Sequence, residues 1–536
     1  IYEYDIFPVR RLKDEETDSE MLEISLNLPH DGQRFIRIPN SLLTDPKKLM
    51  AALADKGVLV HIKEINSLTS YIIEYAKMIQ RESKADEEFA RFGWRDIDTD
   101  NPRFVLGEYV VNNKGELRKA TPANYLKDKK YAVSFKGTLS QWKEGFSIYN
   151  KLDNCEPFKF AVIMGFAAPL LSFTPYFGMI YNMLGEGGCG KSTALKIMTS
   201  IWGRPDEHHI RKEDNRIPMF NTIGYLQSIP VSFDELTTIS ADTLNDLTYS
   251  ISEGRGKDRA DRSGNTRVNT VKWKTIICAS SNLSMYEKLG MVRSGNNASA
   301  YRIFEVQADK ADSANAPAIN EAVIKLENNY GLAGLEYIKY ILKNIKQVKQ
   351  IVANSSATFA RQFNMPTAER FWFNLFGIMS TGGSIARKLG LSEYREDEIV
   401  LWGAKQLANV RETINNVEGD PISIFAHFLQ TNLRSTLIVK NGASNPLLFE
   451  NNVISLLVRL EYFDDIPITG FVSIPAIKEY CKYSNIEYGW LLRKLEETSI
   501  VLNIENKKLG EGTSMLTGLT KCWVVDLQNS IMQKTS

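Results

Sequence analysis

Residues 185–192 read GEGGCGKS, which satisfies the pattern G-x-x-x-x-G-K-[ST] in full. The glycines of such a loop let backbone N–H groups wrap around phosphates without a clash from Cβ atoms. Lys191 is expected to reach the β- and γ-phosphates of ATP, and the Ser192 hydroxyl is expected to bind Mg²⁺. The nucleotide-contacting segment is predicted to comprise Gly185, Glu186, Gly187, Gly188, Cys189, Gly190, Lys191, Ser192 and Thr193.

The residues before this loop are unusually apolar. No charged residue occurs over 160–184, and length alone would suggest a membrane span. Pro169 and Pro175 interrupt the segment, however, and its end runs directly into the glycine-rich loop. We therefore expect no membrane span but a buried helix up to about Leu171, followed by a buried strand over 178–184. A glycine-rich turn without a nucleotide is the alternative, and this strand-loop-helix context argues against it.

The second half of the expected site is a short apolar run that ends in two acids. Residues 229–235 read IPVSFDE. A buried strand here places Asp234 at the Mg²⁺ ion and Glu235 near the γ-phosphate, where its carboxylate can orient the attacking water. Taken alone, an Asp-Glu pair after a strand is commonly a solvated turn. Its position after a complete phosphate-binding loop favours the catalytic interpretation.

A third apolar run ends in an amide side chain. Residues 274–282 read KTIICASSN. Ligands of parallel sheets lie at the carboxyl ends of the strands, so Asn282 is expected to face the nucleotide and to help hold the water. The alternative is an asparagine that caps the next helix.

An arginine follows this strand closely in the sequence. Arg302 lies in the run AYRIFEV at residues 300–306. From such a position it is able to stabilise transition-state charge on the γ-phosphate of a neighbouring subunit, which requires a ring. Arg293 is the second candidate, and an ordinary surface salt bridge is the alternative.

Basic residues are concentrated between the acids and the third strand. Residues 253–267 read EGRGKDRADRSGNTR, and residues 272–274 read KWK. The glycines permit a hairpin turn, and cations on a hairpin in the pore of a ring would hold a phosphate backbone. Asp258 and Asp261 weaken this charge argument and leave a mixed-charge solvated loop as the alternative. The candidate contacts to nucleic acid are Lys257, Arg259, Arg262, Lys272 and Lys274.

The bulk composition is that of an ordinary globular protein. The chain has 536 residues, 43% of them apolar and 24% charged, and a formal net charge of +1. Because the charge is balanced, the argument for a nucleic-acid partner rests on the local cluster. Five scattered cysteines without a C-x-x-C pair argue against a disulfide framework or a zinc site and indicate a reducing, cytoplasmic compartment. The chain starts with Ile1, so additional upstream domains are an open alternative.

The sequence divides into four expected parts. Residues 1–145 combine alternating runs with helical periodicity and predict an α+β domain without a catalytic signature. Residues 146–310 alternate helix, buried strand and loop, as in a nucleotide-binding α/β core. Residues 311–468 are expected to be helical, and residues 469–536 to form a winged-helix-like module from two helices and two strands.

These motifs together resemble a family of phage and mobile-element ATPases. The resemblance is carried by the apolar helix, the loop, Trp202-Gly203 and the run SEGRGKDRAD at residues 252–261. The core is also similar to superfamily three helicases, the hexameric AAA+ group that includes poxvirus-type primase-helicases. Asn282 matches the asparagine of superfamily three, whereas many relatives in the narrower family carry a Thr/Ser-Gly-Glu type ending. The resemblance implies an AAA+ P-loop core within the α/β fold.

The resemblance also implies a function. It implies ATP-driven translocation on single-stranded DNA and duplex unwinding by a homo-hexameric ring, for phage or mobile-element replication. A primase or a replication initiator is then a candidate partner, and the cytoplasm of a bacterial host is the expected location. Two other functions stay open: an AAA+ ATPase that remodels or loads proteins on DNA, and a regulatory ATP-binding protein without motor activity. Strand separation distinguishes the first function from the second, and DNA-independent hydrolysis favours the third.

Overall fold

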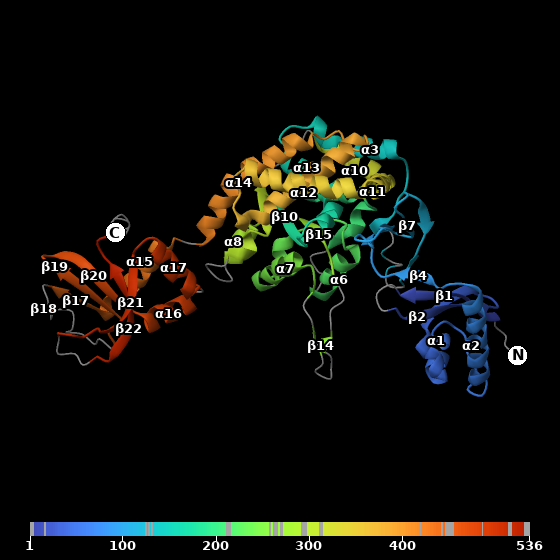
Figure 1. Cartoon of the computed structure of the whole chain (residues 1–536), viewed down its shortest axis with the longest axis horizontal. Helices are drawn as coiled ribbons and strands as arrows, with labels where there is room; N and C mark the ends of the chain where they lie inside the picture. Colours follow the sequence, from blue (N-terminus) through green and yellow to red (C-terminus); the bar gives the residue numbers. More distant parts are fainter. Residues whose placement is uncertain are drawn as a thin grey trace. The chain divides into compact units, whose positions relative to one another are not determined.

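The structure of the protein is a computed structural model, coloured by sequence in Figure 1. The chain forms two compact units, of which one comprises Ile1–Thr238, Tyr249–Asn282 and Val306–Ala404 and the other Ile239–Thr248, Leu283–Glu305 and Lys405–Ser536. The structure describes residues 5–14, 18–123, 126, 129, 132–210, 216–256, 259–260, 266–267, 272–290, 297–309, 315–418, 420–440, 443–444, 455–484, 486–512 and 517–529.

The first sheet has five strands in the order β3-β2-β1-β4-β9. Strand β2 buries Leu22, Ile24 and Leu26 against two helices. Those helices are α1 (Pro46–Ala54) and α2 (Ile65–Glu82). The strands are β1 (Asp5–Asp14), β2 (Glu20–Leu28), β3 (Gly32–Pro39), β4 (Asp86–Phe89) and β9 (Thr121–Pro122).

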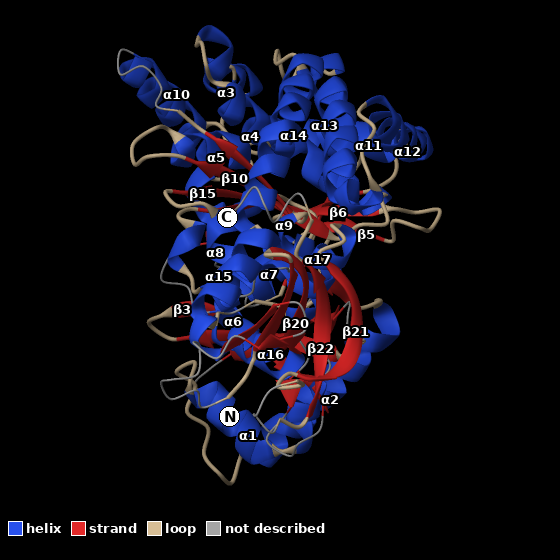
Figure 2. Ribbon diagram, turned by 90° about the vertical axis from the view of Figure 1, so that its left-hand side faces the viewer, coloured by secondary structure: helices blue, strands red, loops and turns tan. Residues whose placement is uncertain are grey.

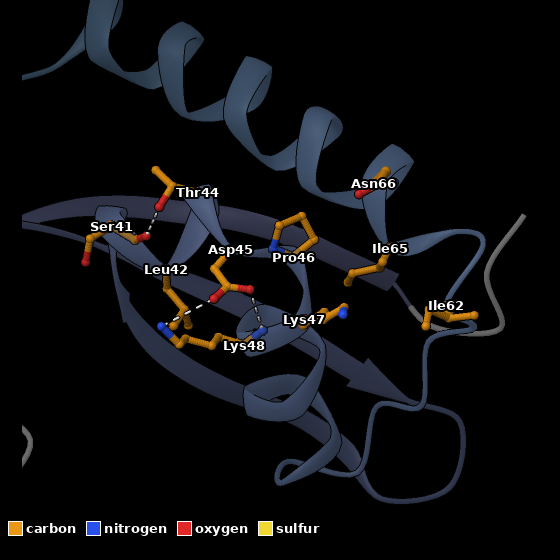
Figure 3. A pocket seen from close by; sticks show the side chains of 10 residues that line it. All are labelled: Ser41, Leu42, Thr44, Asp45, Pro46, Lys47, Lys48, Ile62, Ile65 and Asn66. Atoms are coloured by element: carbon orange, nitrogen blue, oxygen red, sulfur yellow. Dashed lines mark hydrogen bonds and ion pairs between the residues drawn. The ribbon is translucent and has the colours of Figure 1, made fainter.

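Helix α1 begins where capping chemistry favours a helix start. Pro46 lies in its first turn, and the Asp45 carboxylate accepts a hydrogen bond from Lys48 N at 3.3 Å. Asp45 also forms an ion pair with Lys48 Nζ at 3.3 Å, as Figure 3 shows. This end of α1 borders a cavity of about 810 Å³, which Ile62 lines from the turn before α2 and Asn66 from the first turn of α2.

A four-stranded sheet in the order β5-β6-β7-β8 is inserted between β4 and β9. Trp94 fixes it to the following part of the chain, because Trp94 Nε1 donates to Pro169 O at 2.9 Å and Trp94 N donates to Ser228 Oγ at 3.1 Å. The residues predicted as one α+β domain over 1–145 therefore include two separate sheets. The strands of the second are β5 (Gly93–Arg95), β6 (Arg103–Leu106), β7 (Tyr109–Val111) and β8 (Leu117–Lys119).

A third sheet carries the predicted nucleotide-binding motifs, with the strand order β11-β12-β15-β10-β16. Strands β10 and β15 pair in parallel from Gly178↔Thr275 to Leu184↔Ser281, and β12 pairs in parallel with β15. The buried strands predicted at 178–184 and 274–282 are thereby confirmed. The strands are β10 (Gly178–Leu184), β11 (His209–Ile210), β12 (Val231–Phe233), β15 (Thr275–Ser281) and β16 (Ile303–Gln307). The helices along this part are α3 (Leu139–Phe146), α5 (Lys191–Thr199), α6 (Arg216–Leu226), α7 (Ala241–Glu253), α8 (Met285–Gly290) and α9 (Asn297–Ala300).

The apolar segment before β10 forms helix α4 (Glu156–Ala167) and a short 3-10 turn, Ala168–Phe173. By length and composition Glu156–Phe173 is apolar enough to cross a membrane, but 78% of it is buried inside the structure. A helix that is hydrophobic all round is typical of a protein core. The expected buried helix is confirmed.

Helices α10 to α14 follow β16 and cover much of the region predicted to be helical. Helices α12 and α13 lie side by side (Figure 1), and α13 also packs on α4. The helices are α10 (Ala316–Asn328), α11 (Leu332–Lys343), α12 (Ile345–Gln362), α13 (Arg370–Lys388) and α14 (Glu396–Glu418).

The C-terminal part is built on a six-stranded sheet in the order β18-β17-β19-β20-β22-β21. The predicted order of two helices and two strands is confirmed, and β20, β22 and β21 lie side by side in Figure 2. The prediction of a helical region up to residue 468 is wrong from β17 onward, because the β-branched run at 436–440 pairs with β19 in this sheet. The elements are α15 (Pro421–Thr431), β17 (Thr436–Lys440), β18 (Ala443–Ser444), β19 (Val458–Phe463), β20 (Ile466–Ser473), α16 (Ile474–Tyr483), α17 (Tyr488–Glu497), β21 (Val501–Lys508) and β22 (Leu519–Asp526).

Gly93 is the position at which the inserted sheet tolerates a side chain least. Its φ is +87°, and a Cβ atom there would lie 2.1 Å from Ser228 Oγ. We expect Gly93→Ala to lower the free energy of unfolding by about 2–4 kcal/mol, because the left-handed backbone and the close contact both oppose a side chain. Urea denaturation measures this change.

Gly390→Ala is the matched control. Gly390 also has a positive φ, +63°, but its added Cβ would meet only Lys143 Nζ, at 4.0 Å. We expect this variant to lose only about 1 kcal/mol. Equal losses in the two variants would show that backbone strain, and not the contact with Ser228, sets the cost at Gly93.

Candidate functional site

The glycine-rich loop joins the end of β10 to the start of α5. Gly190 is the N-cap of α5 with φ +106°, and Gly188 has φ +79°. Both values lie in the left-handed region, which glycine adopts without strain. No atom lies within 4 Å of a Cβ built at Gly187 or Gly188, so the loop borders open space. The backbone is therefore shaped to admit a group at the N-terminus of α5, where N–H groups favour an anion.

Lys191 is buried, with 6% of its surface exposed. Its Nζ atom donates to Gly185 O at 2.6 Å and to Glu186 O at 2.9 Å. It also donates to Asn282 Oδ1 at 3.1 Å. A buried ammonium needs such partners, and these place its charge between the loop and the end of β15.

Ser192 and Asp234 meet although they lie on different elements. Ser192 Oγ donates to the two Asp234 carboxylate oxygens at 3.0 and 3.1 Å. Ser192 is in the first turn of α5, and Asp234 directly follows β12. A hydroxyl and a carboxylate are oxygen ligands of the kind that Mg²⁺ takes from proteins.

Glu235 and Asn282 form the second close pair. Asn282 N donates to Glu235 Oε1 at 3.2 Å, and Asn282 Nδ2 donates to Glu235 Oε2 at 2.9 Å. The amide of Asn282 thus gives its donor to the carboxylate and its acceptor to the Lys191 ammonium, as the charges require. The alternative of a helix cap does not apply, because Ser284 precedes α8 and its Oγ accepts from Glu287 N at 3.4 Å.

Ser280, a residue without a predicted role, touches both acids. Ser280 Oγ donates to Asp234 Oδ1 at 2.5 Å and accepts from Glu235 N at 3.1 Å. The two-residue period of a strand could have indicated Ser280 as a site residue, because it lies two residues before Asn282 and therefore on the same face.

Arg302 lies between α9 and β16. Its Nη1 atom donates to Ala298 O in the preceding helix. A role on the nucleotide of a neighbouring subunit stays a prediction, as it requires an assembly of several chains. The second candidate, Arg293, lies outside the described residues.

The basic segment contains the expected hairpin. Strand β13 (Arg259–Ala260) pairs antiparallel with β14 (Thr266–Arg267), and β14 lies on the side of the core away from α12 and α13 (Figure 1). Lys272 is exposed and forms an antiparallel bridge with Arg255 at the base. Of the remaining candidate contacts, Lys257 and Arg262 lie outside the described residues.

Lys274 differs from the other candidate contacts because its side chain is engaged within the fold. Lys274 Nζ donates to Thr174 O at 2.9 Å and lies 5.3 Å from the centroid of the Phe177 ring. Burial lowers the pKa of this ammonium. These contacts favour a structural role for Lys274.

The assembled side chains fit ATP and Mg²⁺. The loop offers N–H groups at a helix N-terminus, Lys191 offers a cation, and Ser192 and Asp234 offer oxygen ligands. Glu235 adds a carboxylate that Asn282 orients. Such a donor set can bind a nucleoside triphosphate and hold a water for in-line attack on its terminal phosphate.

Comparison with known proteins gives a family match and a fold match. Residues 6–271 match a family described as a domain of unknown function, DUF927. The chain is similar in structure to a protein described as SCCmec type IV Cch, an active helicase, with a TM-score of 0.69 and 18% sequence identity. The similarity covers 99% of this chain and 94% of that protein, so the two share a fold over nearly their whole lengths. No curated protein matches the sequence significantly.

The position of Lys191 predicts that its removal lowers the rate of ATP hydrolysis. We expect Lys191→Ala to lower ATP turnover by at least about 100-fold, because the variant has no charge directed at the phosphates. Glu235→Gln should also stop turnover but retain nucleotide binding, because its carboxylate is needed only to orient water. Steady-state hydrolysis and binding of a fluorescent ATP analogue measure the two effects.

Lys196→Ala is the matched control for the lysine variant. Lys196 lies in the same helix, but its Nζ forms an ion pair with Asp206 at 2.9 Å. Its removal should leave turnover within about twofold of the wild type, as for an ordinary surface pair. Wild-type turnover in Lys191→Ala would contradict the site.

Proposed function

We propose that the protein is an AAA+ ATPase that uses ATP and Mg²⁺ to translocate on single-stranded DNA and unwind duplex DNA as a hexameric ring. One observation carries the proposal. Hydrogen bonds join Lys191, Asn282 and Glu235, which follow β10, β15 and β12, three neighbouring strands of one sheet. A cation, a water-orienting carboxylate and an amide between them are the parts that phosphoryl transfer to water needs.

Each side chain has a distinct role in this proposal. Lys191 neutralises charge on the β- and γ-phosphates, and Ser192 and Asp234 hold Mg²⁺. Glu235 accepts a hydrogen bond from the attacking water. Asn282 keeps the Glu235 carboxylate oriented, because the backbone N and the side-chain Nδ2 of Asn282 both donate to that carboxylate.

The position of the hairpin supports a nucleic-acid partner. The chain leaves β14 and reaches β15 through Trp273, which is buried and whose N atom donates to Gly254 O at 2.9 Å. The base of the hairpin is therefore anchored. Strand β15, which begins two residues after Trp273, ends at Ser281, directly before Asn282 of the proposed nucleotide site. Hydrolysis of the γ-phosphate can therefore shift the hairpin, whose basic residues would bind the backbone of DNA.

The fold similarity to an active helicase supports this function over protein remodelling. That helicase belongs to SCCmec, which agrees with a role in replication of a mobile element or phage. In a ring, Arg302 would contact the nucleotide of the adjacent subunit. A primase or a replication initiator is the partner we propose, and the bacterial cytoplasm is the location.

The first test is ATP hydrolysis with and without single-stranded DNA. We expect DNA to stimulate turnover at least about tenfold, because strand binding at the hairpin is coupled to β15. Unwinding of a forked duplex should require ATP, and Lys191→Ala is the blank. Hydrolysis indifferent to DNA, without strand separation, would contradict the helicase and indicate a regulatory ATPase.

Lys272 and Lys274 provide a second test. We expect Lys272→Ala to weaken binding of single-stranded DNA and to lower the slope of log K against log salt by about 0.7 for each phosphate that is no longer neutralised, because an exposed cation releases counterions when it binds. Filter binding at several salt concentrations measures the slope.

Lys274→Ala is the matched variant. It removes a hydrogen bond to Thr174 O and the packing of the ammonium on the Phe177 ring. We expect it to lower the free energy of unfolding by about 1 kcal/mol and to leave the salt slope unchanged. The opposite pattern, a salt effect only in Lys274→Ala, would move the DNA contact from Lys272 to Lys274.

A further inference from the structure

Ser280 joins the two acids of the site through one hydroxyl group. Its Oγ donates to Asp234 Oδ1 at 2.5 Å and accepts from Glu235 N at 3.1 Å. A serine hydroxyl has one donor and two acceptor positions, so both bonds can form together. Ser280 is 1% exposed, and water is therefore a poor substitute for either bond.

The backbone of Glu235 explains why the second bond matters. Glu235 has φ +59°, in the left-handed region, which costs a residue with a side chain free energy unless its surroundings hold it there. The bond from Glu235 N to Ser280 Oγ holds the backbone on one side. Thr238 N donates to Glu235 O at 3.1 Å on the other. The turned backbone is what lets the carboxylate reach Asn282.

The bond to Asp234 acts on the expected Mg²⁺ ligand. Ser280 Oγ and Ser192 Oγ both donate to the Asp234 carboxylate, and only Ser192 is exposed. The buried hydroxyl of Ser280 therefore fixes the rotation of the carboxylate, while the exposed side remains able to bind an ion. Groups that orient a metal ligand in this way change metal affinity by about 10- to 100-fold when removed.

We propose that Ser280 is a positioning residue for both acids: it aims Asp234 at Mg²⁺ and holds Glu235 in the left-handed conformation that hydrolysis needs. The inference rests on the proposed function, since it assigns a task to Ser280 in the same nucleotide site. Ser280 is buried and contacts the site through the two acids. Its effect passes through Asp234 and Glu235, so it changes both the Mg²⁺ requirement and kcat.

The test compares Ser280→Ala with the wild-type chain. We expect kcat to fall on the order of 10- to 100-fold, because the variant lacks a hydrogen bond to a charged group. The Mg²⁺ concentration that gives half-maximal ADP binding should rise about tenfold. ADP binding in EDTA should stay within about twofold, because the loop and Lys191 hold the phosphates without the metal. A fluorescent ADP analogue reports both binding curves without turnover.

Two variants separate positioning from folding. Ser281→Ala removes the adjacent buried hydroxyl, which accepts from Asn182 Nδ2 at 2.7 Å and points to the opposite face of β15. We expect it to keep the Mg²⁺ dependence and kcat within about threefold of the wild type. Ser280→Thr keeps the hydroxyl and should restore most of the Mg²⁺ affinity. Thermal melting shows which variants are folded.

The outcomes are distinct. A Mg²⁺ shift in Ser280→Ala that Ser281→Ala lacks and Ser280→Thr reverses would support the role. Wild-type kcat and Mg²⁺ dependence in a folded Ser280→Ala would overturn it while the ATPase assignment stands, and so would equal losses in Ser281→Ala. A wild-type chain that neither hydrolyses ATP nor binds ADP would overturn the proposed function together with this inference.

Discussion

The parallel pairing of β10 with β15 is the constraint on which the site depends. The register runs without a shift from Gly178↔Thr275 to Leu184↔Ser281, so the two strands end at the same edge of the sheet. Strand β12 pairs with the other side of β15 and brings its acids to that edge. Since side chains alternate along a strand, a slip of one residue would turn Ser280 and Asn282 to the opposite face and separate them from Asp234 and Glu235.

Apolar packing behind the sheet keeps this register rigid. Every residue of α4 from Phe160 to Ala167 is buried, and Phe160 packs on Tyr181 of β10 with ring centroids 5.0 Å apart. The Tyr181 hydroxyl donates to Pro157 O at 2.8 Å, so its polar atom is satisfied within the core. Burial raises the pKa of the Cys278 thiol far above its usual range, which makes this cysteine part of the packing and not a reactive group. A site on strands supported in this way holds its geometry better than one on loops.

The inserted sheet and the hairpin base are anchored to neighbouring residues of the same core. Phe92 N donates to Tyr225 O at 2.8 Å, and Lys274 N donates to Gln227 O at 2.9 Å. Arg91 Nη1 donates to Lys272 O at 3.4 Å and links the approach to β5 with the residues that lead into β15. The last turn of α6 and the residue that follows it are therefore held by hydrogen bonds from both segments. Their position, in turn, sets where β12 begins and where Asp234 and Glu235 follow it.

Local spacing in the sequence was sufficient to predict the loop at residues 185–192, the buried strands on either side of the site, and Lys191, Asp234, Glu235 and Asn282 as its polar groups, because each depends on neighbours close in the chain. Long-range contacts decided the rest. The partner of Ser280 at the carboxylate, Asp234, is 46 residues away, and only the paired strands bring the two side chains together. Lys274 was a candidate for DNA by charge, yet its partner Thr174 is 100 residues distant and turns it into the fold. The residues of β17 and β19 were predicted to be helical. A strand is stabilised by pairing with another strand, and the local sequence does not show that β17 and β19 pair with each other.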